Sequence, residues 1–183
     1  MDKRVTVTAG AAAPQDRRPT AMEVGAPVTF TRLGGSFTPP WSRVTSVSVI
    51  AFTPDGTLVI ADLERGLDLP GGHTQRHERS AEETARREAW EETRVTLDDL
   101  APIEVIESDY FGADDLTYMI IFVARVHHMA PWKPGDDESQ GRLLMTPEAF
   151  LARYTAGDRD LMTHLVTTAQ THITQTTTEH TFE

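Results

Sequence analysis

The sequence predicts a single α/β domain, and three observations support this prediction. First, 183 residues with 39% hydrophobic and 25% charged side chains are ordinary usage for one globular domain with a sizeable core. Second, β-rich runs at residues 44–52 and 57–63 flank Thr53-Pro-Asp-Gly56, whose turn-forming residues predict a hairpin. Third, apolar residues recur at helical spacing near the C-terminus. We expect neither an internal repeat nor a second domain.

The predicted domain occupies residues 26–173, between two segments of different composition. Residues 1–25 are rich in Ala, Thr, Pro and Arg without clear periodicity, so we expect a loosely ordered arm or a partly ordered edge strand. Residues 174–183 form a Thr-rich polar tail that we expect to fray.

Further strands are predicted on both sides of the hairpin. Residues 28–32 alternate between apolar and polar side chains, and a short run at 66–69 leads into a Gly-Gly turn. Strands at 102–111 and 116–126 flank another turn, and the second contains the near-continuous apolar run 119–124 that is typical of a central strand. A last strand is expected at 142–145. His127 and His128 would point to opposite faces of their strand, so they cannot chelate one ion there.

Two helices are predicted after the last strand. Thr146 is placed as an N-cap ahead of Pro147, which favours a short helix over 148–154. Helical spacing then predicts a final helix over 159–172 that covers the sheet.

Composition excludes several classes of function. The chain has no cysteine, so disulfides, thiolate zinc sites and thiol nucleophiles are excluded, and the cytoplasm is the simplest location. No window has the length of apolar sequence needed to span a membrane. The formal net charge of -11 argues against a nucleic-acid polymer as partner. A small molecule that carries phosphate would need divalent cations as intermediaries.

The most informative stretch is a helix that follows the Gly-Gly turn. Ser80 and Glu83 have the spacing of a capping box, which predicts a helix start. Further along, Glu88, Glu91 and Glu92 stand at i, i+3 and i+4, which places three carboxylates on one face of this helix. This arrangement is suited to binding a hard cation.

A charged helix that is merely solvated is the alternative interpretation. Three pairs of opposite charge at i, i+4 spacing would explain much of the charge: Glu82–Arg86, Glu83–Arg87 and Arg87–Glu91. The pair Glu88–Glu92 is left over. Its like charges cost roughly 0.2–0.5 kcal/mol unless a cation lies between them.

These residues resemble the signature of the Nudix hydrolase family, which reads G-x5-E-x7-R-E-U-x-E-E-x-G-U with U a bulky apolar residue. The segment Arg87-Glu88-Ala89-Trp90-Glu91-Glu92 matches the R-E-U-x-E-E core, with Ala89 small for U, and Val95 fills the closing apolar position. The resemblance covers roughly residues 44–169 and implies an α/β/α sandwich around a mixed β-sheet.

The chain departs from this signature at two positions. Gly72 is followed by five residues and then Glu78, but eight rather than seven residues separate Glu78 from Arg87. The structural role of the first signature glutamate falls either to Glu78 through a bulged loop, which we favour, or to no residue, because counting back from Arg87 reaches Arg79. The second departure is Arg94 in place of a glycine that often takes positive φ, so we expect a different helix exit.

The resemblance implies a pyrophosphohydrolase that depends on Mg²⁺ or Mn²⁺ and acts on a nucleoside diphosphate linked to another moiety. It implies Glu88 and Glu92 as principal metal ligands, Glu91 as a third or bridging ligand, and a carbonyl near Gly72 in the oxygen shell. Arg87 would orient Glu78 behind them. Glu138, in the acidic loop 131–141, is expected to act as an extra ligand or general base; otherwise it belongs to a solvated turn. One of the helix glutamates could also take the proton from the attacking water.

Substrate contacts are predicted at a few residues outside the helix. Glu64 and Arg65 are candidates, since arginine can hold phosphate oxygens bidentately, although loop arginines are more often solvated. Tyr110 and Tyr118 could line a pocket, or pack in the core. Trp41 could stack on a base, or cap the preceding Pro-Pro turn.

The resemblance leaves the substrate open. Family members acting on ADP-ribose tend to have a proline about fifteen residues beyond the signature, and those acting on dinucleoside polyphosphates a tyrosine; Tyr110 lies fifteen residues after Val95. Isoprenoid diphosphate isomerisation is set aside because the required cysteine is absent. A nucleotide sensor without catalysis is the alternative function. The oligomeric state is also open, with a homodimer as one option.

Overall fold

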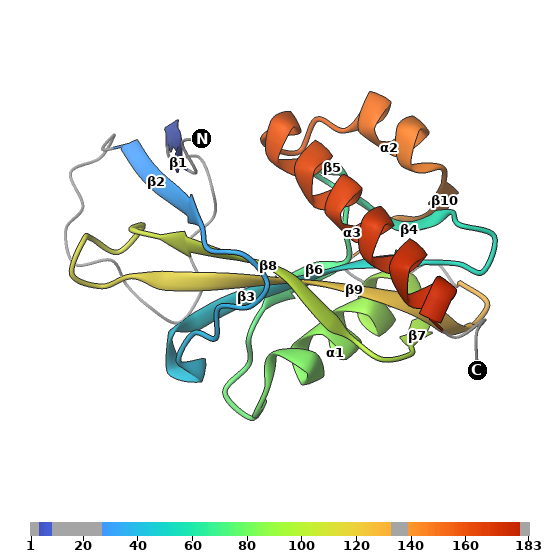
Figure 1. Ribbon diagram of the computed structural model, residues 1–183, viewed down its shortest axis with the longest axis horizontal. Coiled ribbons are helices and arrows are strands. Elements are labelled where there is room, and N and C mark those ends of the chain that lie inside the picture. Colours follow the sequence, from blue (N-terminus) through green and yellow to red (C-terminus); the bar gives the residue numbers. More distant parts are fainter. Residues whose placement is uncertain (1–3, 9–26, 133–138, 180–183) are drawn as a thin grey trace.

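A mixed β-sheet with helices on both faces forms the body of the molecule (Figure 1). The computed structural model describes residues 4–8, 27–132 and 139–179. The strands are β1 (Arg4–Thr8), β2 (Pro27–Arg32), β3 (Val44–Phe52), β4 (Leu58–Leu63), β5 (Gly66–Asp68), β6 (Gly71–His73), β7 (Val95–Leu97), β8 (Ala101–Ser108), β9 (Thr117–Met129) and β10 (Gly141–Met145). The helices are the 3₁₀ turn η1 (Trp41–Arg43), α1 (Ala81–Thr93), α2 (Pro147–Arg153) and α3 (Arg159–Glu179).

The order of strands across the sheet is β1-β2-β8-β9-β3-β4-β10. Its central pair, β9 and β3, is parallel, while the other pairs along this path are antiparallel. The predicted α/β/α sandwich around a mixed sheet is therefore confirmed. The predicted hairpin is also present, and β1, within the segment expected to be a loose arm, pairs with β2 at one edge of the sheet.

The sheet opens between β3 and β4, and this opening places the glycine turn. Phe52 and Leu58 are the only residues of β3 and β4 that pair with each other. Further along β3, residues 46–48 pair with β6 instead. The Gly-Gly turn predicted from the sequence is thus hydrogen-bonded along the middle of the sheet. The loop that feeds α1 starts from this position.

Alternation along β3 separates two apolar layers. Val47, Val49 and Ala51 belong to the cluster beneath α1, which contributes the small residues Ala85 and Ala89. The opposite face carries larger side chains, Ile50, Phe52, Leu58 and Ile60. They belong to one cluster with Phe150 of α2 and with Leu165 and Val166 of α3. In Figure 1, α1 lies below the sheet, and α2 and α3 lie above it.

Helix α3 extends to Glu179, beyond the predicted end at His172. The hydroxyls of Thr171, Thr174 and Thr176 donate to main-chain carbonyls four residues earlier in the same helix. The described part of the Thr-rich segment, residues 174–179, is therefore helical, with these hydroxyls bonded within the helix itself. Within the described part of the chain, no helix is both long and apolar enough to cross a membrane.

The exit of α1 corrects a second expectation. Arg94 adopts the left-handed conformation itself, with φ 55° and ψ 38°, and its N–H donates to the carbonyl of Trp90 at 3.0 Å. The helix thus ends as a glycine would end it, at a local cost of roughly 1–2 kcal/mol for a residue with a Cβ. The Arg94 guanidinium lies 5.4 Å from the centroid of the Trp90 ring, a cation–π distance that offsets part of this cost.

Candidate active site

The loop before α1 is fixed by the predicted helix cap. Ser80 is extended, with φ -151°, and its hydroxyl accepts a hydrogen bond from the Glu83 N–H at 3.3 Å. The Glu83 carboxylate in turn accepts from the Arg79 N–H at 2.7 Å. Glu83 is thus part of the N-terminal cap of α1. It does not form the ion pair with Arg87 that the i, i+4 spacing suggested.

Glu78 is the buried anchor of this loop. Its carboxylate accepts from the Gln75 N–H at 2.6 Å, the Thr84 hydroxyl at 2.7 Å and Arg87 Nε at 2.7 Å. Burial acts to raise the pKa of Glu78, but these hydrogen bonds and the charge of Arg87 outweigh it, so the pKa lies below its ordinary value. The extra loop residue therefore leaves Glu78, and not Arg79, in contact with Arg87.

Trp41 supports the same loop from the other side. Its indole N–H donates to the Glu78 carbonyl oxygen at 3.3 Å, and its ring packs against the apolar cluster beneath α1. Trp41 therefore packs within the fold, as in the second of the two predicted roles, and its ring is not free to stack on a base.

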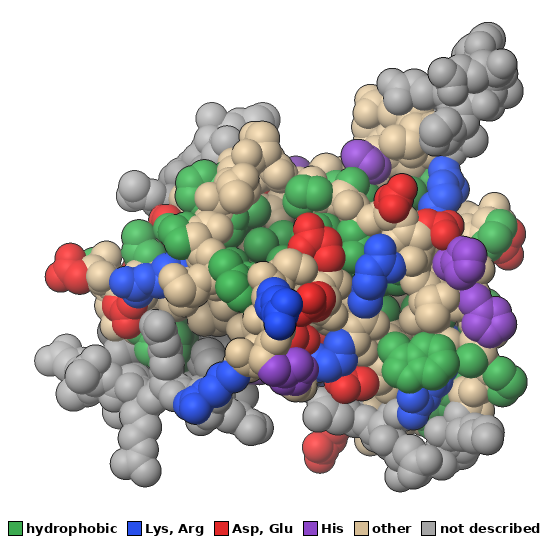
Figure 2. All heavy atoms as spheres, turned by 90° about the horizontal axis from the view of Figure 1, so that it is seen from below, with side chains coloured by type: hydrophobic (Ala, Val, Ile, Leu, Met, Phe, Trp, Pro, Cys, Tyr) green, Lys and Arg blue, Asp and Glu red, His purple; other side chains and the backbone are tan. Residues whose placement is uncertain are grey.

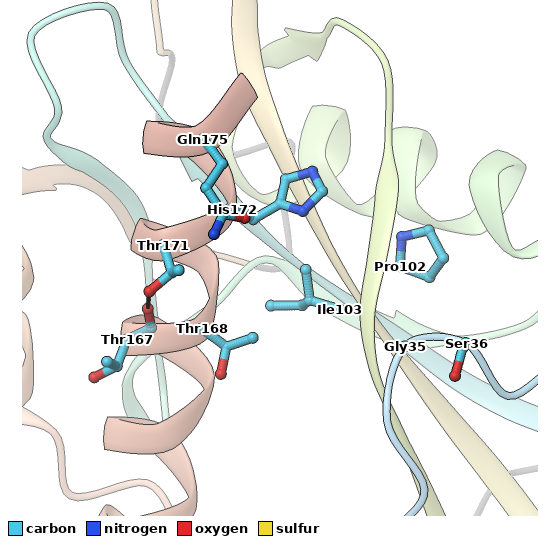
Figure 3. Close-up of a pocket in the computed structure, with 9 residues that line it drawn as sticks. All are labelled: Gly35, Ser36, Pro102, Ile103, Thr167, Thr168, Thr171, His172 and Gln175. Carbon is cyan, nitrogen blue, oxygen red and sulfur yellow. Dashed lines mark hydrogen bonds between the residues drawn. The ribbon is translucent and has the colours of Figure 1, made fainter. Parts of the chain in front are cut away.

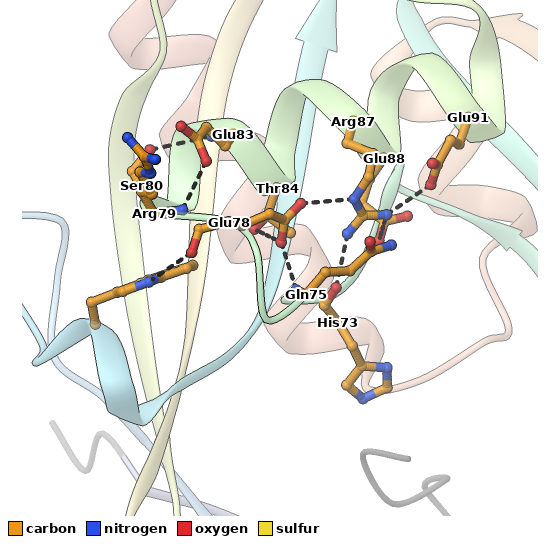
Figure 4. Close-up of polar contacts among 11 residues, drawn as sticks. His73, Gln75, Glu78, Arg79, Ser80, Glu83, Thr84, Arg87, Glu88 and Glu91 are labelled. Atoms are coloured by element: carbon orange, nitrogen blue, oxygen red, sulfur yellow. Dashed lines mark hydrogen bonds and ion pairs between the residues drawn. The ribbon is translucent and has the colours of Figure 1, made fainter. Parts of the chain in front are cut away.

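Arg87 joins the loop to the helix through four acceptors (Figure 4). In addition to Glu78, its guanidinium donates to Glu88 Oε1 at 2.7 Å, Glu91 Oε2 at 2.7 Å and the His73 carbonyl at 2.9 Å. Burial alone would lower the pKa of Arg87, but the three carboxylates raise it well above its ordinary value. A cation at this position is permanently charged.

The remaining ion pairs expected along α1 differ from the prediction. Arg87–Glu91 forms, whereas Arg86 donates to the carbonyl oxygens of Leu97 and Asp98 and ties α1 to the end of β7. Acidic and basic side chains alternate over the middle of the face that α1 covers (Figure 2).

Glu88 and Glu92 are the most buried carboxylates of the helix, with 5% and 3% of their surface exposed. Glu92 Oε2 accepts from the Gly71 N–H at 2.9 Å. Burial raises the pKa of Glu92 to about 7; the charges of Glu88 and Asp68 also raise it, while the Gly71 hydrogen bond and Arg65 lower it. Glu92 thus lies near a second acid in surroundings that disfavour its charge.

The Gly71–Gly72 turn is required by the closeness of its neighbours. A Cβ at Gly72 would overlap the Glu88 carboxylate, and one at Gly71 would overlap Ser48 and the Val47 carbonyl oxygen. Glycine therefore lets β6 lie directly against β3 and the acids of α1.

Glu91 shares the Arg87 Nη1 donor with Glu88. It is partly exposed and directed at Arg87, and no three His, Asp or Glu side chains in the described residues are close enough together to hold a metal ion as they stand. The physical reason is that Arg87 draws Glu88 and Glu91 to itself, while Glu92 accepts from Gly71.

The predicted substrate residues make local contacts. Arg65 pairs with Asp68. Tyr110 packs edge-on against Phe111, with ring centroids 5.1 Å apart, and Tyr118 lies 5.7 Å from the Phe37 ring. The predicted general base, Glu138, lies outside the described residues. His127 and His128 are exposed, as predicted, and His127 lies 2.9 Å from Asp98.

Sequence reasoning missed Asp68, whose charge reaches Glu92. The alternation in Gly66-Leu-Asp-Leu69 was an available signal, because a single acid between two buried leucines must face away from the core they enter.

A separate cavity of about 420 Å³ lies between α3 and β8 (Figure 3). Its lining includes Ser36, Ile103, Thr168, His172 and Gln175, and none of the α1 glutamates. The cavity is therefore distinct from the carboxylate site.

The fold and this loop–helix network define the class of protein, an α/β/α sandwich with a buried pair of acids beside a glycine turn. The family model of the NUDIX domain matches residues 42–165, and the chain belongs to the Nudix family. No curated protein sequence matches the chain.

Solved structures share the fold at low sequence identity. The pyrophosphohydrolase BsRppH of Bacillus subtilis, solved as a mutant, is 20% identical over 81% of this chain and 92% of its own, with a TM-score of 0.63. A NUDIX hydrolase of Nitrosomonas europaea is 14% identical over 70% and 90%, with a TM-score of 0.54. The NUDIX domain of Shewanella oneidensis NrtR, complexed with ADP ribose, is 15% identical over 71% and 91%, with a TM-score of 0.53.

Proposed function

We propose that the protein is a metal-dependent hydrolase that cleaves the diphosphate linkage of a nucleoside diphosphate joined to another moiety. The observation that carries this proposal is the buried pair Glu88 and Glu92, packed against Gly71–Gly72. Arg87 pairs with Glu88, but no cationic side chain among the described residues contacts Glu92, and burying a carboxylate without a cation is unfavourable.

The groups around this pair suit Mg²⁺ or Mn²⁺. The side-chain donors are carboxylate oxygens, the donor atoms that hard divalent cations prefer, and the absence of any Gly72 side chain leaves Glu88 close to the backbone of β6. Glu88 and Glu92 are the ligands we propose, with Glu91 as a third and the Gly72 carbonyl as a further oxygen. A bound divalent cation neutralises phosphate charge and lowers the pKa of the attacking water.

The neighbouring residues would hold this arrangement and bind the substrate. Arg87 and Glu78 fix the loop on the helix and so position the two acids. Arg65 is proposed to contact phosphate, and Tyr110 and Tyr118 to lie along the nucleoside. Either Glu138 or one of the helix glutamates would take the proton from the attacking water.

The names of two proteins of similar structure support this substrate class. BsRppH is described as a pyrophosphohydrolase, and the NrtR domain was crystallised with ADP ribose, a nucleoside diphosphate joined to a sugar. A small-molecule nucleotide is the partner we propose.

One observation favours a second candidate, a nucleotide sensor that does not cleave its ligand. Arg87 holds both Glu88 and Glu91, so a cation has to compete with a guanidinium for these acids. A protein in which Arg87 wins this competition would bind nucleotides without hydrolysing them.

A release assay separates the two candidates. Purified protein is incubated with Mg²⁺ or Mn²⁺ and a panel of ADP-ribose, nucleotide sugars, dinucleoside polyphosphates and nucleoside triphosphates, and released phosphate and monophosphates are measured. The hydrolase predicts turnover of at least one compound that chelation with EDTA abolishes. If no compound of the panel is hydrolysed but a nucleotide binds, the result would support the sensor instead.

A further inference from the structure

Arg65 and Asp68 form a fixed pair at the hairpin between β4 and β5. Arg65 Nε and Nη2 both donate to Asp68 Oδ2, at 3.2 Å and 3.1 Å. The second oxygen, Oδ1, accepts from the Leu69 N–H at 2.9 Å. The carboxylate is thus held by the backbone on one side and holds the guanidinium on the other.

The two partners differ in burial. The Asp68 side chain is 19% exposed and that of Arg65 is 57% exposed. Asp68 also pairs in register with Ala61 on β4, so its backbone is part of the sheet. The third guanidinium nitrogen, Nη1, has no hydrogen-bond partner among the described residues and remains available to a ligand.

Asp68 faces the side of the sheet on which α1 lies, because its neighbours Leu67 and Leu69 belong to the apolar cluster on the side of α2 and α3. Asp68 is three residues from Gly71, whose N–H donates to Glu92, and three residues of chain span at most about 11 Å. The charges of Arg65 and Asp68 both act on the pKa of Glu92, and Arg65 also lowers the pKa of His73 on β6.

We propose that Asp68 is a positioning residue that holds the Arg65 guanidinium at the mouth of the Glu88–Glu92 site, where it receives phosphate oxygens of the substrate. The inference rests on the proposed function, in which Arg65 contacts phosphate. Exposed ion pairs contribute little to stability, so the fold alone gives weak reason for this geometry. An arginine that is already held loses less conformational freedom when a ligand binds, which is worth roughly threefold to tenfold in affinity.

A double-mutant cycle tests this role. The variants are Asp68→Ala, Arg65→Ala and the double variant, with Asp98→Ala as a control that removes a more exposed acid, the partner of His127. With a compound that the enzyme hydrolyses, D68A should raise KM roughly threefold to tenfold and leave kcat within about twofold. R65A should raise KM at least as much, and adding D68A to R65A should change nothing further.

Additive effects of the two substitutions on KM, or an unchanged KM in D68A, would overturn the proposal. Where D68A folds poorly, Asp68→Asn serves instead, because its amide oxygen can still accept from the Leu69 N–H; its KM should rise in the same direction.

A binding readout separates this inference from the proposed function. Titration calorimetry with inorganic pyrophosphate and Mg²⁺ measures Kd for the same variants, whether or not the protein turns anything over. One outcome is that the wild type turns over no compound while the effects of D68A and R65A on Kd are non-additive as described. In that case the proposed hydrolase activity is wrong, but the positioning role of Asp68 stands. If the wild type binds no pyrophosphate at millimolar concentrations, the role of Asp68 is overturned.

Discussion

Glu92 on α1 and Glu104 on β8 are equally buried, each 3% exposed, but their partners differ in kind. Glu104 accepts from Arg32 Nε at 3.2 Å, lies 3.2 Å from His164 Nε2, and accepts from the Gly34 N–H. Glu92 accepts from one backbone N–H and lies near the carboxylate of Glu88. Cationic side chains contact the first acid, whereas none among the described residues contacts the second.

The comparison shows that burial alone does not mark a functional carboxylate. Glu104 joins β2 and β8 to α3, so its charge is used to hold the sheet to the helix above it. Glu92 lies on α1, and its carboxylate accepts from the glycine turn against which the Glu88 carboxylate also packs. For these two acids, the kind of partner therefore distinguishes the structural acid Glu104 from the candidate ligand Glu92.

The largest expected effect is on catalysis by Glu92→Gln. Removing the charge should lower Mg²⁺-dependent turnover by roughly a thousandfold, about 4 kcal/mol of transition-state stabilisation. The Tm of E92Q at pH 8 should equal that of the wild type or be slightly higher, because a buried charge is removed. The measurement is kcat/KM with a compound from the panel, and full activity in E92Q would refute the site.

Glu104→Ala should show the converse pattern. It leaves Arg32 and His164 without their shared acceptor, so the free energy of unfolding should fall by about 1–3 kcal/mol. Denaturant titration measures this loss. At a temperature where the variant is folded, kcat should stay near that of the wild type, and a selective loss of kcat would place Glu104 in the site.

Stabilisation by Mg²⁺ should depend on pH. The folded pKa of Glu92 is raised from 4.5 to about 7, so the stability that its protonated form provides is complete below pH 4.5 and lost as the pH rises through about 7. A cation needs the ionised form, so its affinity should be about 30-fold weaker at pH 5.5 than at pH 8. The increase in Tm on adding Mg²⁺ is the measurement, with E92Q as control. An equal increase at both pH values in the wild type would contradict the role of Glu92.

The smallest effect concerns the exit of α1. Arg94→Gly removes the left-handed strain but also the contact with the Trp90 ring, so the two terms oppose each other. We expect a net stabilisation below about 1 kcal/mol. Arg94→Ala keeps the strain and should destabilise. Equilibrium unfolding of both variants measures the difference, and R94A more stable than R94G would show that the strain is not the main term.

The fold could be predicted from the sequence because its signals are local. The cap at Ser80, the hairpin around Thr53-Pro-Asp-Gly56 and the apolar run of β9 each depend on residues close in the chain. Pairing of β6 with β3 could not be predicted, since it depends on where the sheet opens.

For the candidate site, the sequence proposed residues, but it predicted their contacts less well. Spacing identified Glu88 and Glu92, but it also suggested pairs for Arg86 and Glu83 that backbone groups took instead. The positive φ of Arg94 was missed because the need for a left-handed exit outweighed the preference of the side chain. The partners of Glu104 were invisible, as they lie 60 or more residues away in sequence.

The most direct test of the account is Mn²⁺ binding followed by electron paramagnetic resonance in the wild type, E92Q and E104Q. The account predicts a bound Mn²⁺ signal in the wild type and in E104Q, and at least a tenfold weaker affinity in E92Q. Equal Mn²⁺ affinity in all three proteins would contradict the claim that the acids of α1 form the metal site.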